Sequence, residues 1–386
     1  MVSKRKGSDR KRGLREGRSI RYGVVGLGWF AQTAILPAFA HAKKNSGLVA
    51  LFSEDPKKLE ALGRKYRVPK ECRFSTDDLE DGIASAGVDA VYIATPNDLH
   101  REFAVRAARA GVHVLCEKPM AVTERDCEEM IRAAEKAGVK LMIAYRLHFE
   151  RGNLEAVEIV NSGKLGEPRI FASVFCNDVK DPDNIRLNPI EKGGGTLYDI
   201  GIYCLNAARY LFRSEPVEVV ALSARGADPR FSETDEMTSA ILRFPDERLA
   251  TFTSSFGAAS SHFYDVYGTK GRLRVEPAFE FAEGMAHELK IGERKSKKKF
   301  AARDQVAPEI LSFSECILED REPEPSGREG LADVRVIRAL YESARTGKPV
   351  RLGRFEKRTR PSLEQEVRRP PTQEPELVGV DKPSEG

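Results

Sequence analysis

Lys118, Asp199 and Tyr203 are residues whose types suit proton transfer at a hydroxyl or carbonyl group. Lys118 follows an apolar run and precedes a proline, which restricts the backbone at the lysine. Asp199 and Tyr203 are four residues apart, so on a helix they share one face. A carboxylate can orient a substrate, and a phenol can exchange a proton with it. Taken singly, each motif also fits a surface tripeptide or an ordinary helix face.

A glycine-rich turn near the N-terminus has the composition of a phosphate-binding loop. It follows an apolar run, precedes a helical pattern and reads Gly26, Leu27, Gly28, Trp29, Phe30 and Ala31. In such a G-x-G-x-x-A turn the first glycine permits the tight turn and the second lets the backbone approach a pyrophosphate. The amides at the helix start can then bind the anion. We therefore predict a dinucleotide site here.

The end of the second expected strand bears on the choice between NAD and NADP. An acidic residue at this place suits the ribose hydroxyls of NAD, whereas a cation suits the 2′-phosphate of NADP. Ser53 and Lys58 supply a hydroxyl and an ammonium, which favour NADP. Glu54 and Asp55 leave NAD as the less favoured alternative, unless they cap the helix that begins at Pro56.

Short apolar runs alternate with helical patterns from about residue 20 to residue 145. The expected strands are Arg21–Val25, Leu48–Phe52, Ala90–Ala94, Val112–Cys116 and Lys140–Ala144. The expected helices are Pro56–Tyr66, Leu99–Ala110 and Thr123–Ala137, the last with a threonine cap. This alternation predicts an α/β domain with a doubly wound parallel sheet. Ligands of such sheets bind beyond the carboxyl ends of the strands, where Lys118 is expected.

The pattern changes after residue 146. A helix at Asn153–Asn161, a strand at Arg169–Cys176 and a helix at Thr196–Phe212 come first. Five strand-like segments follow: Val217–Ala224, Met237–Phe244, Leu249–Phe256, Phe263–Tyr267 and Arg272–Val275. Helices at Pro308–Leu318 and Leu331–Thr346 close the region. Strands without intervening helices predict an α+β domain with a large, mostly antiparallel open sheet.

The composition of the chain bears on whether the protein binds a metal, spans a membrane or is exported. The six cysteines form no C-x-x-C pair and the six histidines are scattered, so we expect no metal. There is no apolar run of about 18 residues, so we expect no membrane span. Residues 1–18 contain eight Lys/Arg and two Asp/Glu, which predicts a solvated basic leader. The apolar stretch behind it imitates a secretory signal, but glycines that serve the phosphate loop interrupt it. We therefore expect a cytoplasmic protein.

Five motifs in order give the chain a family resemblance. They are G-L-G-W-F-A from Gly26, A-T-P-N-D-L-H from Ala94, C-E-K-P from Cys116, A-Y-R from Ala144 and G-G-G-T-L-Y-D-I-G-I-Y from Gly193. Together they resemble the Gfo/Idh/MocA oxidoreductase family over residues 20–352. The likeness extends to the glucose–fructose oxidoreductases, which share tyrosine rather than histidine at the position of Tyr203. The resemblance implies a Rossmann domain and a second domain whose open sheet often joins subunits into a homodimer or homotetramer.

The resemblance also implies roles for individual residues. Lys118, Asp199 and Tyr203 match the family's catalytic positions. The matching cofactor positions are Gly26, Gly28, Trp29, Phe30, Ser53, Lys58, Thr95, Pro96, Asn97, His100, Glu117, Lys118, Arg146 and Arg186. The chain divides accordingly into a disordered leader at 1–19, an NADP-binding domain at 20–146, a substrate and oligomerisation domain at 147–353 and a disordered tail at 354–386.

The implied reaction is hydride transfer between the nicotinamide of NADP and C1 of an aldose. A neutral phenol is a poor base near neutral pH. An ammonium about 4 Å away favours the phenolate by about 4 kcal/mol at an effective dielectric constant near 20. We therefore expect Lys118 to lie beside Tyr203 and activate it, while Asp199 holds substrate hydroxyls.

The same residues are compatible with other functions. One is a ketosugar reductase or a dihydrodiol dehydrogenase, which would use the same residues on another sugar or polyol. A different class is a non-catalytic redox regulator that binds NADP and whose basic leader contacts nucleic acid. The presence of Lys118, Asp199 and Tyr203 together argues against a regulator, so we expect a small-molecule substrate and no nucleic acid.

Overall fold

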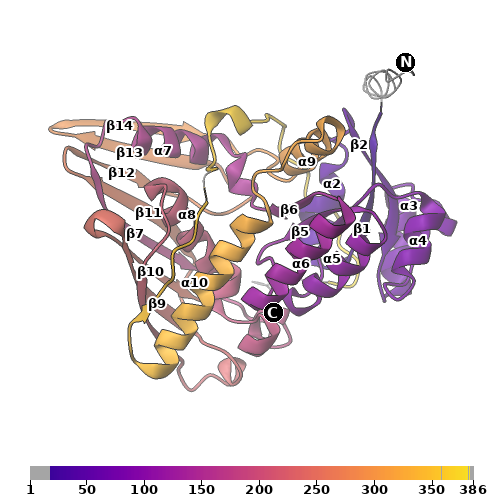
Figure 1. Ribbon diagram of the computed structural model, residues 1–386, viewed down its shortest axis with the longest axis horizontal. Coiled ribbons are helices and arrows are strands. Elements are labelled where there is room, and N and C mark those ends of the chain that lie inside the picture. The colour runs from indigo at the N-terminus through magenta and orange to yellow at the C-terminus, as the bar shows by residue number, and fades with distance from the viewer. Residues whose placement is uncertain (1–17, 358, 381, 383–386) are drawn as a thin grey trace, which may run out of the picture.

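Two β-sheets form the framework of the computed structural model, which describes residues 18–357, 359–380 and 382. In Figure 1 the two sheets lie at opposite ends of the molecule, with helices between and beside them. Residues 1–17 of the expected leader lie outside the described residues.

The first sheet consists of six parallel strands in the order β3-β2-β1-β4-β5-β6. These strands are β1 (Ile20–Val25), β2 (Ser46–Phe52), β3 (Arg73–Phe74), β4 (Ala90–Ile93), β5 (His113–Glu117) and β6 (Leu141–Ala144). The predicted parallel sheet is confirmed, and its five expected strands begin and end within two residues of the expected limits. Strand β3 was missed because two residues are too few to show a period.

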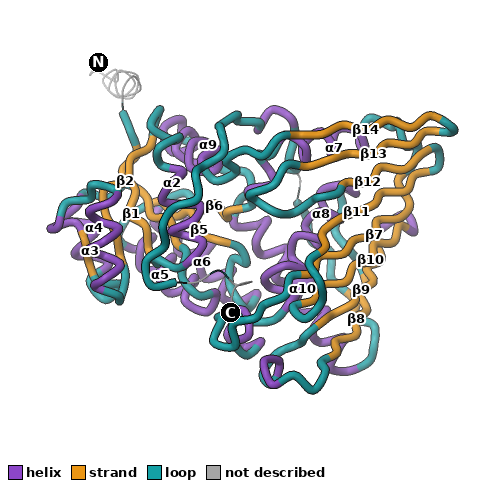
Figure 2. Tube along the Cα trace, turned by 180° about the vertical axis from the view of Figure 1, so that it is seen from behind, coloured by secondary structure: helices purple, strands orange, loops and turns teal. Residues whose placement is uncertain are grey.

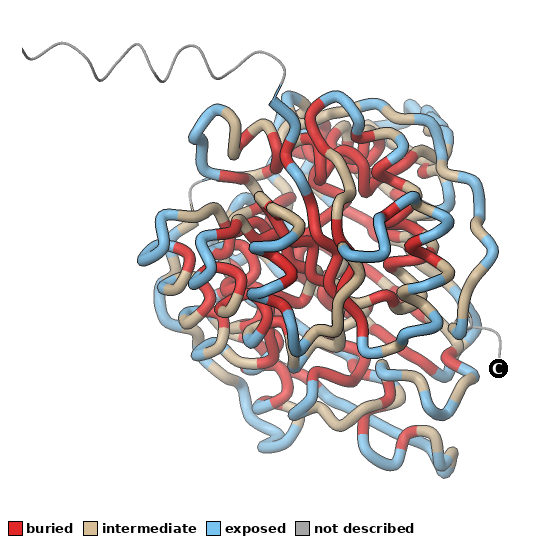
Figure 3. Tube along the Cα trace, turned by 90° about the vertical axis from the view of Figure 1, so that its right-hand side faces the viewer, coloured by how far each residue is buried: buried red, intermediate tan, exposed pale blue. Residues whose placement is uncertain are grey.

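Helices cover both faces of this sheet. One face carries η1 (Ala31–Ile35), α2 (Leu36–Ala38) and α3 (Pro56–Lys65), and the other carries α4 (Leu79–Ala86), α5 (His100–Arg109) and α6 (Glu124–Ala137). Asp55 caps α3, because its carboxylate accepts hydrogen bonds from the amides of Lys57 and Lys58 at 2.8 and 3.2 Å. Thr123 caps α6 as expected and accepts from the amide of Asp126 at 3.1 Å. Seen from this end of the molecule, the buried segments run through the centre and exposed loops form the rim (Figure 3).

The second sheet has nine strands in the order β14-β13-β12-β11-β7-β10-β9-β8-β15. They are β7 (Pro168–Cys176), β8 (Glu218–Ala224), β9 (Met237–Phe244), β10 (Arg248–Ser255), β11 (Ser261–Gly268), β12 (Gly271–Val275), β13 (Met285–Ile291), β14 (Arg294–Phe300) and β15 (Val350–Arg351). Only β7 and β10 pair in parallel, so the predicted mostly antiparallel sheet is confirmed. Strands β13 and β14 were not predicted.

Helices lie on one face of the second sheet and leave the other face open (Figure 2). They are α7 (Arg151–Asn161), α8 (Ile202–Phe212) and α10 (Gly327–Thr346). Along β9 the burial alternates strictly, with outward residues exposed and inward residues buried. Several apolar side chains remain exposed on the described surface, among them Ile170, Ile241, Leu249 and Tyr267.

Helix α9 (Ala307–Glu319) comes from the second half of the chain but packs on the first sheet. The hydroxyl of Tyr22 on β1 lies 2.8 Å from Ser314 Oγ and donates to the carbonyl of Ile310 at 3.3 Å. The helix was expected from the sequence, but its placement on the dinucleotide domain was not, because an amphipathic pattern does not identify the surface it packs on.

The C-terminal segment differs from the expected disordered tail. Lys357 is 2% exposed in its side chain and pairs with Glu324 and Glu329 at 2.7 and 2.8 Å. Arg360 is 3% exposed and pairs with Glu215 at 2.7 Å. The charged, proline-rich composition suggested disorder, but these charges meet buried partners of opposite sign, which composition does not reveal.

Candidate active site

The glycine-rich turn connects β1 to the helical segment that contains η1. Gly26 has a φ of +92°, and a Cβ there would lie 2.6 Å from the carbonyl oxygen of Ala94. At Gly28 a Cβ would meet nothing within 4 Å, so the backbone has open space beside it that a pyrophosphate can fill. The carbonyl of Gly28 accepts a hydrogen bond from the amide of Gln32 at 3.1 Å, which begins the helix directly at the turn.

Trp29 and Phe30 pack against Phe281 from the second half of the chain, with ring centroids 5.8 and 5.5 Å apart. This aromatic contact joins the glycine-rich turn to the loop between β12 and β13. Among the buried polar atoms that have no hydrogen-bond partner in the described part of the chain are Nε1 of Trp29 and Oγ1 of Thr95. Such atoms are expected to bond to a ligand or to water. With the open space at Gly28, they make the loop a fitting place for a dinucleotide.

Ser53 directly follows β2, Lys58 lies in the first turn of α3, and both contact Asp55. Ser53 accepts from the amide of Asp55 at 3.1 Å, and Lys58 Nζ lies 3.8 Å from the Asp55 carboxylate. Asp55 is therefore a helix cap, which is the role that leaves NADP favoured over NAD. Glu54 is not a cap: it accepts from the amide of Thr76 at 2.8 Å in the loop after β3. A serine and a lysine at this place fit a phosphate.

His100 connects the loops that follow β4 and β5. Its Nδ1 lies 2.9 Å from the carbonyl of Pro119, and its Nε2 lies 3.0 Å from the carbonyl of Thr95. The side chain is fully buried, and burial lowers the pKa of His100. A neutral imidazole has one N–H, so one of the two carbonyls accepts its hydrogen bond and the other only contacts the ring of this predicted cofactor residue.

Asn97 joins the first domain to the triple-glycine turn of the second. Pro96 directly precedes the short helix η3 (Asn97–Leu99), and Asn97 Nδ2 donates to the carbonyl of Gly193 at 2.7 Å. A Cβ at Gly194 would lie 1.8 Å from the carbonyl oxygen of Asn188, so this turn needs glycine. The turn leads directly into the helical segment that carries Asp199 and Tyr203.

Lys118 and Asp199 form the centre of the site. The ammonium of Lys118 donates to the carbonyl oxygen of Asp199 at 2.8 Å and to its carboxylate at 3.3 Å. The other carboxylate oxygen accepts from Nε of Arg186 at 2.6 Å. The structure therefore brings the two predicted catalytic residues together and adds Arg186, expected at the cofactor, as the second partner of Asp199.

The neighbouring charges determine the protonation states of Lys118 and Asp199. Burial would raise the pKa of Asp199, but the positive charges of Arg186 and Lys118 outweigh it and lower the pKa to about 2. Burial would lower the pKa of Lys118, but the neighbouring Tyr203, Asp199 and Glu117 raise it above its ordinary value. Lys118 is therefore an ammonium and Asp199 a carboxylate at neutral pH.

The ring of Tyr203 lies near two cations. Lys118 Nζ is 4.7 Å from the centroid of its ring, and the guanidinium carbon of Arg146 is 4.9 Å from it. Arg146 is nearly buried and is held by Gln305, at 2.5 Å, and by the carbonyl of Phe279. Within the described part of the chain the Tyr203 hydroxyl has no hydrogen-bond partner. An unpartnered hydroxyl of this kind can bond to a ligand or to water.

Two helical segments at the site contain π-helical turns, η1 after the glycine loop and η7 (Leu197–Gly201) before α8. Asp199 lies in the π-helical turn and Tyr203 at the start of α8. The wider turn changes the angle between the two side chains, yet both still reach Lys118. Such bulges are frequent at functional sites, but they have no sequence pattern from which to predict them.

Glu117 meets a second acid, Glu309, that was not predicted from the sequence. Tyr92 donates to Glu117 at 2.8 Å, and its hydroxyl lies 3.5 Å from Glu309 on helix α9. Burial raises the pKa of both carboxyl groups. Glu117, expected at the cofactor, is thus bonded to the protein interior. Nothing in the sequence around Glu309 indicates this contact, because it depends on where α9 packs.

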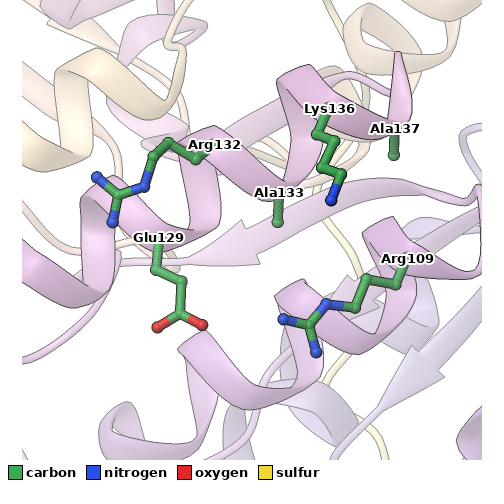
Figure 4. A pocket seen from close by; sticks show the side chains of 6 residues that line it. All are labelled: Arg109, Glu129, Arg132, Ala133, Lys136 and Ala137. Carbon is green, nitrogen blue, oxygen red and sulfur yellow. The ribbon is translucent and has the colours of Figure 1, made fainter.

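The hollow in Figure 4 lies away from this group, between α5 and α6. Its lining residues are Arg109, Glu129, Arg132, Ala133, Lys136 and Ala137, and none belongs to the predicted site.

Over the residues that the structure covers, no cluster of three or more His, Cys, Asp or Glu side chains could hold a metal ion. In the same part of the chain no helix is both long and apolar enough to span a membrane.

A glycine-rich turn at the end of the first strand of a parallel sheet, facing a lysine, an aspartate and a tyrosine, defines a dinucleotide-dependent oxidoreductase with a Rossmann domain. Family models agree: residues 20–145 match the oxidoreductase family with NAD-binding Rossmann fold, and residues 153–274 match the GFO/IDH/MocA C-terminal domain. The chain belongs to the Gfo/Idh/MocA family of oxidoreductases, which confirms the resemblance seen in its motifs.

Several characterised proteins are similar over most of the chain. The D-xylose 1-dehydrogenase [NADP(+)] of Haloarcula marismortui is 33% identical and matches 86% of this chain and 93% of its own. The aldose-aldose oxidoreductase of Caulobacter crescentus is 43% identical, with a TM-score of 0.83 over 87% of this chain and 100% of its own. The 3-ketoreductase KijD10 of Actinomadura kijaniata is 26% identical, with a TM-score of 0.75 over 84% of this chain and 98% of its own.

Proposed function

We propose that this protein is an NADP-dependent sugar oxidoreductase that transfers hydride between nicotinamide and C1 of an aldose. The observation that carries the proposal is the contact of Lys118 with both Asp199, at 3.3 Å, and the ring of Tyr203, at 4.7 Å. Relatives named for D-xylose and for aldoses support a sugar as substrate.

The choice of NADP rests on two supports. Ser53 after β2 and Lys58 in α3 offer a hydroxyl and an ammonium. Asp55 caps α3 and lies 3.8 Å from Lys58, while Glu54 bonds to the loop after β3. The similar D-xylose dehydrogenases are named for NADP(+), and the similar 3-ketoreductase was crystallised with NADP. When bound, the dinucleotide supplies the hydride acceptor. The turn that Gly26 permits would bring the backbone at Gly28 to its pyrophosphate, and Thr95 would contribute its unpartnered hydroxyl.

The protein's own residues would handle the proton. Arg186 holds Asp199, and Asp199 holds Lys118 beside the ring of Tyr203. Tyr203 then accepts the proton of the sugar C1 hydroxyl during oxidation and returns it during reduction. Asp199 orients neighbouring hydroxyls of the sugar.

A substrate panel tests this proposal. Purified protein is mixed with NADP or NAD and with single aldoses, and reduced nicotinamide is followed by its absorbance. We expect turnover with D-xylose or D-glucose and NADP, slower turnover with NAD, and none with 1,5-anhydro-D-glucitol, which lacks the C1 hydroxyl. Equal turnover of the anhydro sugar would place the reaction at another carbon. In a parallel assay that supplies NADPH and ketosugars, oxidation of NADPH without turnover of any aldose would favour the ketosugar reductase.

A further inference from the structure

The last described part of the chain lies against the helices that flank the dinucleotide loop. The amide of Val378 donates to Oε1 of Gln32 at 2.8 Å, and Nε2 of Gln32 donates to the carbonyl of Val378 at 2.9 Å. Lys65, at the end of α3, donates to the carbonyl of Glu376 at 3.0 Å. Figure 1 shows this end of the chain, in yellow, lying at the side of the first sheet. The segment therefore docks on η1 and α3 through specific bonds.

Gln32 connects this segment to the glycine-rich turn. The same Nε2 atom that bonds Val378 also donates to the carbonyl of Leu27 at 3.0 Å. Leu27 lies between the two glycines of the phosphate loop, and Gln32 is 1% exposed. One buried amide group thus joins the C-terminal segment to the loop, so the docking of the segment bears directly on the loop's conformation.

The segment also reaches the side chain proposed for the 2′-phosphate. A Cβ at Gly379 would lie 3.4 Å from Cε of Lys58 and 3.8 Å from a carboxylate oxygen of Asp55. The Lys58 side chain is only 18% exposed, because neighbouring groups cover its stem. A lysine has a long stem with many rotamers, so covering the stem reduces the entropy lost when the ammonium binds a phosphate.

We infer that residues 376–380 form an outer wall of the dinucleotide site, which holds Gln32 and Lys58 in place and retains the 2′-phosphorylated dinucleotide. This inference rests on the proposed function, because it assumes that NADP binds along Gly28, Ser53 and Lys58. Lys58 is placed to bind the 2′-phosphate, which NAD lacks. Loss of the wall therefore weakens NADPH more than NADH.

A proline substitution tests the wall in the full chain. Val378→Pro removes the amide that donates to Gln32. Bound NADPH is displaced by excess NADP in a stopped-flow fluorimeter, and the measurement is repeated with NADH. We expect the NADPH release rate to rise about tenfold and the NADH rate by less than about threefold. Gln373→Pro, in an exposed part of the same segment, is the matched control and leaves both rates unchanged.

A chain that ends at Pro375 gives a second, independent variant without the wall. Circular dichroism confirms that both variants keep the native fold. Unchanged NADPH release in both variants overturns the inference, and so does an equal acceleration for NADPH and NADH. If the wild-type protein binds neither nucleotide, the proposed function itself is wrong. That result differs from tight binding by the wild type with unchanged release rates in the variants, which overturns only the inference about residues 376–380.

Discussion

At the scale of single residues, Asp199 uses both carboxylate oxygens in ion pairs, one with Lys118 and one with Arg186. These charges lower the pKa of Asp199 to about 2, below its ordinary value of 3.8. A carboxylate with a lowered pKa stabilises the fold above its ordinary pKa, and this contribution is lost as the pH falls towards the lowered value. The arrangement of Lys118 beside Tyr203 is therefore expected to persist from neutral pH into mildly acidic conditions.

The hydroxyl of Tyr203 is the atom on which the proposed chemistry depends. Tyr203→Phe keeps the ring contacts with Lys118 and Arg146 but removes the proton acceptor. We expect kcat to fall about 10²- to 10⁴-fold with little change in melting temperature, as is usual for loss of a general base. Steady-state kinetics with the best aldose and thermal unfolding measure both quantities.

Tyr198→Phe is the matched control for that substitution. Tyr198 lies five residues earlier in the same helical segment, and its hydroxyl donates to the carbonyl of Val122 at 2.6 Å. Its loss is expected to lower stability by about 1 kcal/mol but not kcat. Near-normal kcat for Tyr203→Phe would exclude Tyr203 as the proton acceptor.

The sequence predicted which residues meet at the site but not all of their partners. Lys118 and Tyr203 were expected together because Lys118 follows a strand of a parallel sheet and the tyrosine belongs to a matching motif. The pairing of Arg186 with Asp199 and the contact of Glu309 with Tyr92 depend on side-chain packing between distant segments. No local spacing encodes such contacts.

At the scale of elements, the glycine-rich turn has one glycine for folding and one for the ligand. Gly26 has a positive φ and lies too close to Ala94 for any side chain. Gly28 has neither constraint, since a Cβ there meets open space. Gly26 is therefore required by the fold, whereas Gly28 is expected to be required by the dinucleotide.

Gly28→Ala should leave the fold intact and impair binding. The added methyl occupies the space where the pyrophosphate would approach the backbone. We expect the Kd for NADPH to rise about tenfold or more, with an unchanged melting temperature. Fluorescence titration measures the Kd. Gly47→Ala is the control, because its Cβ would also lie in open space, 3.9 Å from Ser19, and away from the site. An unchanged Kd in Gly28→Ala would mean that the dinucleotide does not cross this turn.

The predicted elements begin and end within a few residues of the expected limits, and several short or highly charged elements were missed. Strand β3 and helix α4 are short, and β14 is almost entirely Lys and Arg, so it lacks the alternation of a half-buried strand. Lysine on an edge strand protects it from pairing with other chains, which explains its polar composition. The domain limits at residues 146 and 353 stay a prediction, and α9 shows that packing crosses the first of them.

At the scale of the whole molecule, the two halves of the chain are interlocked. Helix α9 and the C-terminal segment both return from the second half to pack on the first sheet. The site lies where the halves meet, because Lys118 comes from the first and Asp199 from the second. Cutting the chain between the halves would therefore remove part of the dinucleotide domain's own core.

The open face of the second sheet carries exposed apolar side chains. Leu249, Ile170 and Tyr267 are aligned across three neighbouring strands and are 42%, 46% and 38% exposed. Adjacent exposed apolar side chains of this kind mark contact surfaces between proteins. We therefore predict that the protein forms a homodimer or homotetramer through this face, with two copies packing sheet against sheet.

Charges placed on this face should separate the copies. Ile170→Asp combined with Leu249→Asp would bury two carboxylates without partners in the interface, which is strongly unfavourable. Sedimentation velocity should give a multiple of the chain mass of 42.9 kDa for the wild type and a single chain for the variant. Lys164→Asp, in an exposed turn before β7, is the control and should sediment like the wild type. If the wild-type protein sediments as a single chain, the prediction is wrong, because no second copy then covers the apolar face.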